Sequence, residues 1–521
     1  MKFFRLLTLL LVLVAGQVHA QENLPKDMDK YVDQVLQTFR VPGLSLAVVK
    51  DGKVLLAKGY GTKKLGAAER VDKQTLFPIA SNSKAFTATA LALLVEEGKI
   101  AWDSPVVNYL PWFKMSDPYV TANMTVRDLL IHRSGIAAYA GDLLQFPPSN
   151  FTREEIVRKA QFLPLVASFR DNYAYDNILY LAAGELIQHV TGESWEDFVA
   201  ERIMQPVGMQ NSISRISTLK NQPNYSVPHA RFNDEIHEVT NFFKYGVADI
   251  SNPAGGIASN AEDMSKWLIT QLDSGRTASG KVIYKPSTTV QLWKGVTPMP
   301  VAKLPVYLKP AQMDYQLYAL GFYTSNYRSE RILMHGGKLD GFVSRVFMVP
   351  SQNLGIAVLT NQESSSACMS IINHIVDHFL RVADYDWITA YKKNEDRYFA
   401  GVKEAEKASS ASRNRLSKPA LQLAKYTGDY VDAWYGKVSI KLDKGKLLMD
   451  FTHNPGMVGV MEHWQYDTFI VRWNNREFKA DAYVTFALNP DGSIDQIKMR
   501  AISPVTDPSY DFHDLLLKPR K

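Results

Sequence analysis

The chain has 521 residues, of which 46% are hydrophobic and 21% charged, a composition typical of a globular protein rather than a disordered one. Its length predicts more than one domain. The net charge of +6 is small and not clustered along the chain, which argues against a nucleic-acid partner. The only cysteine is Cys368, so an internal disulfide is excluded and stability must come from a packed core.

Residues 1–20 have the pattern of a secretion signal. A basic start at Lys2 and Arg5 precedes an apolar run at residues 6–15, and residues 18–20 match a small-residue cleavage site. The apolar run is too short to span a bilayer, and no later stretch of the sequence indicates an anchor. We therefore expect a periplasmic or secreted protein with no transmembrane anchor.

The region after this signal begins and ends with strand patterns. Residues 44–49 and 54–60 predict a hairpin, and residues 342–349 and 354–359 predict another pair about a short turn. Between and around these pairs, apolar residues with helical spacing predict helices at 27–40, from 81 to about 98, and at 125–131, 178–190, 195–203 and 369–380. A further helix is expected after the glycine turn at 253–257, capped by Ser259 or Asn260 and with Met264 and Trp267 facing inward. Antiparallel strand pairs with segregated helices indicate an α+β fold.

The sequence changes in character after residue 391. Residues 392–420 are polar and charged, and they predict a helix that frays into a linker. Short apolar runs separated by turn residues follow, at 438–442, 447–451, 469–473, 482–488 and 494–499. Such regular short strands predict a small all-β domain, a barrel or a sandwich. We therefore expect domains at 21–391 and 421–521.

A serine and a lysine lie one helical turn apart in Ser81-Asn-Ser-Lys84, at the start of a helix that is apolar on all sides. A helix of this kind is buried, so a hydroxyl and an amine would share one face at its N-terminal end. This pairing suits a nucleophile with its base. A second match, Ser217-Thr-Leu-Lys220, has no apolar helix behind it, and we interpret it as coincidence.

Two further motifs are ambiguous when taken alone. Tyr175-Asp-Asn177 precedes a predicted helix and could supply a general base and an amide for substrate, but a helix cap with a core tyrosine is the simpler interpretation. His335-Gly-Gly337 could let a ligand lie against an edge strand, but a tight turn is simpler. Paired histidines in His374-Ile-Val-Asp-His378 have helical spacing, and we interpret them as a solvated helix face rather than a metal site.

In this order, the motifs resemble those of the class C β-lactamase-like branch of the penicillin-recognising serine hydrolases. Leu129-Leu-Ile-His-Arg-Ser-Gly-Ile136 and Pro253-Ala-Gly-Gly256 match two more landmarks of that branch, so the resemblance covers residues 27–385. The branch includes D-aminopeptidases, D-Ala-D-Ala carboxypeptidases and esterases. The resemblance implies a β-lactamase-like antiparallel sheet flanked by helices, a helical subdomain, and a lipocalin-like C-terminal β domain.

The resemblance also implies the roles of individual residues. Ser81 would form an acyl-enzyme, with Lys84 and Tyr175 sharing the proton transfers. The backbone N–H groups of Ser81 and Lys338 would form the oxyanion hole. Substrate-binding roles would fall to Asn177, His335, Gly337 and Lys338, with no cofactor and no metal.

Departures from the family pattern bear on the substrate. His335 stands where β-lactamases have a lysine, and it would hold a substrate carboxylate less well. Asp176 replaces a small residue, and it would either hold a cationic group or face solvent. We therefore predict a secreted serine hydrolase of small or D-residue-containing peptides. The alternatives are an esterase or weak β-lactamase, and a non-catalytic penicillin-binding-like scaffold. The C-terminal domain has two candidate roles, to shape substrate access to Ser81 or to mediate oligomers.

Overall fold

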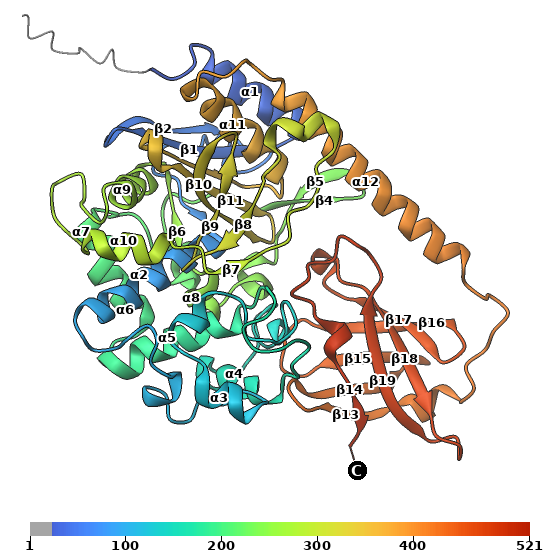
Figure 1. Ribbon diagram of the computed structural model, residues 1–521. Coiled ribbons are helices and arrows are strands. Elements are labelled where there is room, and N and C mark those ends of the chain that lie inside the picture. Colours follow the sequence, from blue (N-terminus) through green and yellow to red (C-terminus); the bar gives the residue numbers. More distant parts are fainter. Residues whose placement is uncertain (1–22, 521) are drawn as a thin grey trace, which may run out of the picture.

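An antiparallel sheet of eight strands forms the centre of the first domain in the computed structural model, which describes residues 23–520 (Figure 1). The predicted secretion signal lies outside the described residues. The strand order is β2-β1-β12-β11-β10-β9-β8-β7. The strands are β1 (Gly43–Lys50), β2 (Lys53–Gly61), β7 (Thr297–Pro298), β8 (Gln316–Tyr318), β9 (Tyr323–Tyr327), β10 (Glu330–Leu339), β11 (Phe342–Val349) and β12 (Leu354–Thr360).

Helices cover both faces of this sheet, so its central strands are mainly apolar. In β1, Leu46 and Val48 face one hydrophobic core, while Ala47 and Val49 face the other. The first core is closed by α1 (Met28–Phe39) and α11 (Ser365–Phe379), which lie together above the sheet in Figure 1. The helix α9 (Ala261–Leu272) and the helical subdomain cover the second hydrophobic core. Burial on two faces explains the unbroken apolar runs that predicted these strands.

The helical subdomain is built around α2 (Ser83–Glu96), the apolar helix predicted after Ser81. Every residue of α2 from Ser83 to Leu94 is buried. Its neighbours are α5 (Ile178–Thr191), α6 (Trp195–Val199) and α8 (Asn252–Gly255). The remaining elements are α3 (Pro118–Asn123), α4 (Arg153–Lys159), α7 (Gln205–Val207), α10 (Pro286–Trp293), and the short pairs β3 (Phe77–Pro78) with β6 (Ala258–Ser259) and β4 (His229–Phe232) with β5 (Glu235–Glu238).

Two predicted helices differ from the structure. The segment at 125–131 is only a 3₁₀ turn over Arg127–Leu130, because the Asp128 carboxylate accepts hydrogen bonds from the backbone and hydroxyl of Thr125 and fixes a tight local turn. The helix predicted at 195–203 ends at Val199 and continues as a π-helical turn.

The helix α12 (Trp387–Ala411) leads from the first domain to a second sheet of eight strands (Figure 1). The order of the second sheet is β19-β18-β17-β16-β15-β14-β13-β20. Ile497 and Leu517 exchange backbone hydrogen bonds of 2.8 and 3.2 Å across the remaining gap, so the sheet is a nearly closed barrel. Its strands are β13 (Gly428–Asp432), β14 (Gly436–Asp443), β15 (Lys446–Phe451), β16 (Val458–Gln465), β17 (Thr468–Trp473), β18 (Ala482–Leu488), β19 (Ile494–Ala501) and β20 (Lys518–Pro519).

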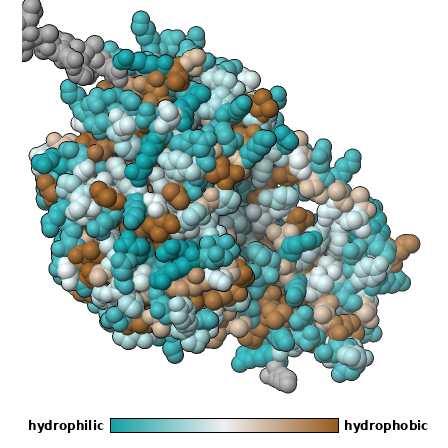
Figure 2. Space-filling model, in the orientation of Figure 1, coloured by the Kyte–Doolittle hydropathy of each residue, from teal (hydrophilic) through white to brown (hydrophobic). Residues whose placement is uncertain are grey.

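Polar contacts hold this barrel domain against the first domain. The buried Asn454 amide donates to the backbone oxygens of Leu143 and Pro147 at 3.0 and 2.6 Å. Farther along the contact, the Glu477 carboxylate accepts from the backbone N–H of Thr240 at 2.9 Å. Figure 2 shows a hollow between the two domains beside this contact. Within residues 23–520, no helix has the length and apolar character needed to cross a membrane.

Candidate active site

Ser81 lies on a 3₁₀ turn, Ala80–Asn82, that leads directly into α2. The residue before it, Ala80, has a φ of 47°, which is uncommon for a residue with a side chain and is typical of strained turns at functional sites. The turn is fixed from outside, since the backbone N–H of Ile257 donates to the Ser83 hydroxyl at 3.0 Å. Ser81 itself is partly exposed and lines a pocket.

Lys84 is completely buried beside Ser81, and its amine has three fixed neighbours. Its Nζ lies 2.8 Å from Asn177 Oδ1, 2.8 Å from the backbone oxygen of Ala254 and 3.2 Å from Ser81 Oγ. A neutral amine has two N–H groups and one lone pair. When the two N–H groups donate to Asn177 and Ala254, the lone pair is directed at the Ser81 hydroxyl.

The environment of Lys84 favours this neutral form. Burial lowers the pKa of the Lys84 amine to about 7, although the nearby carboxyl groups of Asp142 and Asp176 oppose that shift. An amine with a pKa near the working pH is suited to accept a proton from a hydroxyl.

Tyr175 contacts Ser81 from the opposite side. Its hydroxyl donates a 2.8 Å hydrogen bond to Ser81 Oγ. Burial raises the pKa of Tyr175 well above its ordinary value, so the phenol keeps its proton. Lys84 is therefore placed to accept the Ser81 proton, and Tyr175 is placed to donate one, as the resemblance implies for the protonation of a leaving group.

Covalent labelling of Ser81 by a fluorophosphonate should accelerate as the pH rises through about 7, the pKa of Lys84. Only the neutral amine accepts the Ser81 proton, so the rate should fall about tenfold per pH unit below the midpoint and level off above it. Intact-protein mass spectrometry at timed points from about pH 5 to about pH 9 measures this rate. A rate independent of pH over that range would rule out Lys84 as the base.

Strand β10 brings the glycine motif against the nucleophile. A Cβ on Gly337 would lie 2.2 Å from the backbone oxygen of Ile79 and 2.9 Å from Ala80 Cβ, so only glycine permits this approach. β10 pairs with β9 only as far as Met334, and the described residues provide no strand partner on that side beyond it. Lys338, the next residue of the strand, lines the pocket together with Ser81.

The structure places His335 and Asp176 away from the pocket. The His335 ring is buried, its Nε2 lies 3.0 Å from the Tyr318 hydroxyl, and burial lowers the pKa of the imidazole well below its ordinary value. A neutral, buried imidazole does not support the prediction that His335 binds a substrate carboxylate. Asp176 is also fully buried, and its carboxylate accepts a 3.3 Å bond from the Ser134 hydroxyl, so it faces neither solvent nor a substrate cation.

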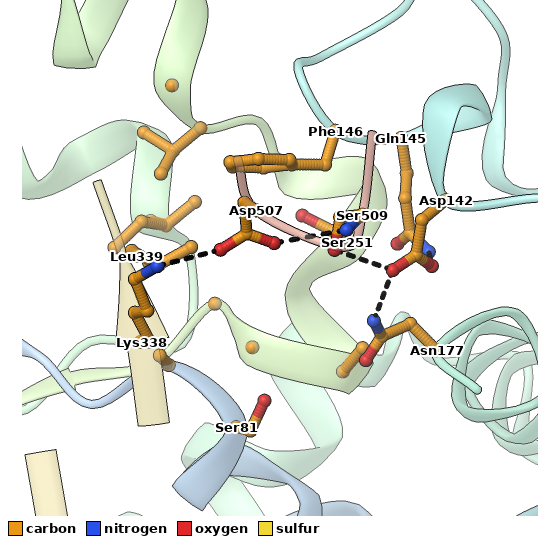
Figure 3. A pocket seen from close by; sticks show the side chains of 17 residues that line it. Ser81, Asp142, Gln145, Phe146, Asn177, Ser251, Lys338, Leu339, Asp507 and Ser509 are labelled. Atoms are coloured by element: carbon orange, nitrogen blue, oxygen red, sulfur yellow. Dashed lines mark hydrogen bonds and ion pairs between the residues drawn. The ribbon is translucent and has the colours of Figure 1, made fainter. Parts of the chain in front are cut away.

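The barrel domain supplies two residues of the pocket that the sequence gave no sign of, Asp507 and Ser509 (Figure 3). The Asp507 carboxylate forms an ion pair of 3.1 Å with Lys338, across the domain boundary. The Ser509 hydroxyl donates at 2.7 Å to Asp142, a third unpredicted residue, which also accepts from Asn177 Nδ2 at 2.7 Å. No local pattern marks Asp507 and Ser509, because their partners Lys338 and Asp142 lie 169 and 367 positions away in the chain.

The two motifs interpreted as non-functional lie elsewhere. Ser217 is in an exposed turn, and its hydroxyl donates to Asp249 at 2.6 Å. On α11, His374 stacks on the Tyr31 ring at 3.8 Å between centroids, and His378 Nε2 lies 2.9 Å from the backbone oxygen of Asn23. Each histidine therefore has a structural partner.

A hydroxyl between a buried lysine and a tyrosine, beside a sheet strand, is the arrangement of a β-lactamase-type serine hydrolase. The Beta-lactamase family model matches residues 28–377, and the chain belongs to this family, whose members are serine hydrolases. A family described as "Domain of unknown function (DUF3471)" matches residues 412–519, which include the barrel. The predicted fold class, with its C-terminal β domain, is confirmed.

Some of the proteins similar to this chain match both of its domains, and others match about two thirds of it. The chain is 28% identical over 494 residues to the unguisins hydrolase ungD' of Aspergillus campestris, covering 91% of this chain and 88% of that one. The octameric penicillin-binding protein homologue of Pyrococcus abyssi has the same fold, with a TM-score of 0.58, 20% identity, and coverage of 94% and 99%. The D-amino acid amidase of Ochrobactrum anthropi SV3 shares the fold over 68% of this chain and 98% of its own, with a TM-score of 0.54 and 23% identity.

Proposed function

We propose that this protein is a secreted hydrolase that forms an acyl-enzyme on Ser81 and acts on small peptides or amides, including those with D-residues. The observation that carries the proposal is the position of Ser81 Oγ, 3.2 Å from Lys84 Nζ and 2.8 Å from the Tyr175 hydroxyl, at the pocket. The names of the relatives, an unguisins hydrolase and a D-amino acid amidase, support a hydrolase, and the second supports amides with D-residues as substrates.

The reaction begins when neutral Lys84 takes the proton of Ser81, whose oxygen attacks the substrate carbonyl. The backbone N–H groups of Ser81 and Lys338 stabilise the oxyanion, each donor contributing about 3 kcal/mol. Tyr175 gives its proton to the leaving nitrogen and is reprotonated from Lys84, so the C–N bond breaks and the amine departs neutral. Water then attacks the ester, and its proton returns to the Ser81 oxygen.

Two measurements test this proposal. A fluorophosphonate should label intact protein once, on Ser81. A panel of D-amino-acid amides, p-nitrophenyl esters and nitrocefin should then show the fastest turnover with the amides. Faster turnover of the esters or of nitrocefin would favour those alternatives, and absence of both labelling and turnover would identify a non-catalytic scaffold.

Replacing Tyr175 with phenylalanine should separate the two proton transfers. Amide hydrolysis should fall about 100-fold, because the leaving nitrogen needs a proton. Fluorophosphonate labelling should change by less than about threefold, since fluoride leaves without one. Tyr173→Phe is the matched control, because its hydroxyl bonds only the Tyr323 hydroxyl, at 3.0 Å. An equal loss in both assays would contradict the assignment of Tyr175 as the acid.

The Lys338–Asp507 ion pair bears on the β-lactamase alternative. The Lys338 side chain is 46% exposed and Asp507 is 23% exposed, so Asp507 neutralises a cation that a substrate carboxylate could otherwise use. Asp507→Ala should therefore raise kcat/KM for nitrocefin about fivefold relative to neutral p-nitrophenyl acetate. Asp491→Ala, in an exposed turn of the barrel domain, is the control. An unchanged ratio would show that the pair does not select against carboxylates.

A further inference from the structure

Asp142 joins the barrel domain to the catalytic groups, although no motif includes it. It is fully buried, and it accepts hydrogen bonds from three side chains: Asn177 Nδ2 and the Ser509 hydroxyl, both at 2.7 Å, and Gln145 Nε2 at 3.0 Å (Figure 3). All three partners are donors, and two of them come from the first domain while Ser509 comes from the barrel.

The barrel domain also fixes the backbone that carries Asp142. The buried Asp511 carboxylate accepts from the backbone N–H groups on either side of it, Gly141 at 2.6 Å and Leu143 at 3.2 Å. Gly141 has a φ of 81°, a left-handed conformation that favours glycine. The position of the Asp142 carboxyl group is therefore set by two residues of the other domain, Ser509 and Asp511.

This carboxyl group determines which way the Asn177 amide points. Burial raises the pKa of Asp142 to about 7, while the hydrogen bonds from Ser509 and Asn177 act to lower it. All three side-chain partners donate to the Asp142 oxygens, so the group of Asn177 that faces Asp142 is the NH₂ and the group that faces Lys84 is the oxygen. If the amide were reversed, its NH₂ would compete for the Lys84 lone pair. The amine could then no longer accept the Ser81 proton.

We propose that Asp142 is a positioning residue, held by Ser509 and Asp511 of the barrel domain, that orients the Asn177 amide and so directs the lone pair of Lys84 at Ser81. The inference rests on the proposed acylation of Ser81. It assigns the barrel domain a part in catalysis, because the domain holds the residue that orients the proton acceptor.

The negative charge of Asp142 should also raise the pKa of Lys84, an effect that a purely structural residue would not have. The titratable groups facing Lys84 are Asp142 and the groups on or before α5 (Tyr175, Asp176 and Tyr180), together with His132 and His335 from the other sides. Removing the negative charge of Asp142 while keeping its shape should lower the pH midpoint for Ser81 labelling, since the ammonium form of Lys84 loses a stabilising charge.

The experiment compares fluorophosphonate labelling rates across pH for four variants of the full-length protein. Asp142→Ala should label about 100-fold more slowly than wild type, because the base is misdirected. Asp142→Asn should keep the plateau rate within about threefold and move the midpoint to lower pH. Ser509→Ala should slow labelling severalfold, while Glu477→Gln, which weakens a contact of the barrel domain far from Ser81, should match wild type.

The outcomes separate this inference from the proposed function. If wild type is not labelled on Ser81, the proposed function itself is wrong. If wild type is labelled but Asp142→Ala labels at the same rate, or Asp142→Asn keeps the wild-type midpoint, the positioning role is wrong. Should Asp142→Ala not fold, as judged by its thermal unfolding, Asp142→Asn and Ser509→Ala still decide the question, and wild-type behaviour of both overturns it.

Discussion

Replacing Ser81 with alanine is expected to abolish covalent labelling and to reduce turnover of any substrate by at least about 10⁴-fold, because the attacking oxygen is removed. The loss should leave folding intact, since Ser81 is partly exposed and the hydrogen bonds of its hydroxyl within residues 23–520 are those with Lys84 and Tyr175. Labelling followed by intact mass spectrometry, with kcat measured on the best amide of the panel, checks both expectations.

The chain contains its own control for this experiment. Ser217 begins the second Ser-x-x-Lys match, but it lies in an exposed turn with its hydroxyl bonded to Asp249. Ser217→Ala should therefore be labelled and turn over substrate as wild type does. If Ser81→Ala were still labelled, or if Ser217→Ala were not, the nucleophile would have been assigned to the wrong serine.

The second large effect is expected from Lys84→Met. Methionine has a similar length and no charge, so it suits a fully buried position, but it cannot accept a proton. We expect kcat to fall about 10³-fold and the pH dependence near neutrality to disappear, because the group that titrates there is gone. Lys220→Met, in the second Ser-x-x-Lys match, supplies the matched control. Retention of the wild-type pH profile by Lys84→Met would show that another group is the base.

Some elements were missed because their sequences are locally weak. Strand β10 contains two adjacent glycines, which have low strand propensity, and its motif was interpreted as a turn or an edge strand. Strand β8 and strand β9 follow a proline-rich stretch and are short. Pairing with β11 holds β10 in the sheet, an effect of neighbours that no local pattern contains.

The helices and the apolar strands are easier to predict, because burial on one face imposes a helical period and burial on both faces gives an apolar run. The predicted hairpin at 44–60 corresponds to β1 and β2, and the helices predicted at 27–40 and 178–190 correspond to α1 and α5. The helix expected after Ser259 or Asn260 corresponds to α9. In α9, Asn260 caps the helix by accepting from the backbone N–H of Asp263 at 2.9 Å.

The sequence by itself located the proposed acylating centre, since Ser81 and Lys84 lie one turn apart before and within a helix whose apolar composition requires burial. Such spacing is a local property of the sequence. It named Tyr175 and Asn177 through their motif. Only the tertiary structure decided that Asp142, Asp507 and Ser509 belong to the same pocket, because docking of the barrel brings together residues from distant parts of the chain. Packing between domains, which leaves no periodic pattern in the sequence, therefore completes the pocket in which Ser81 lies.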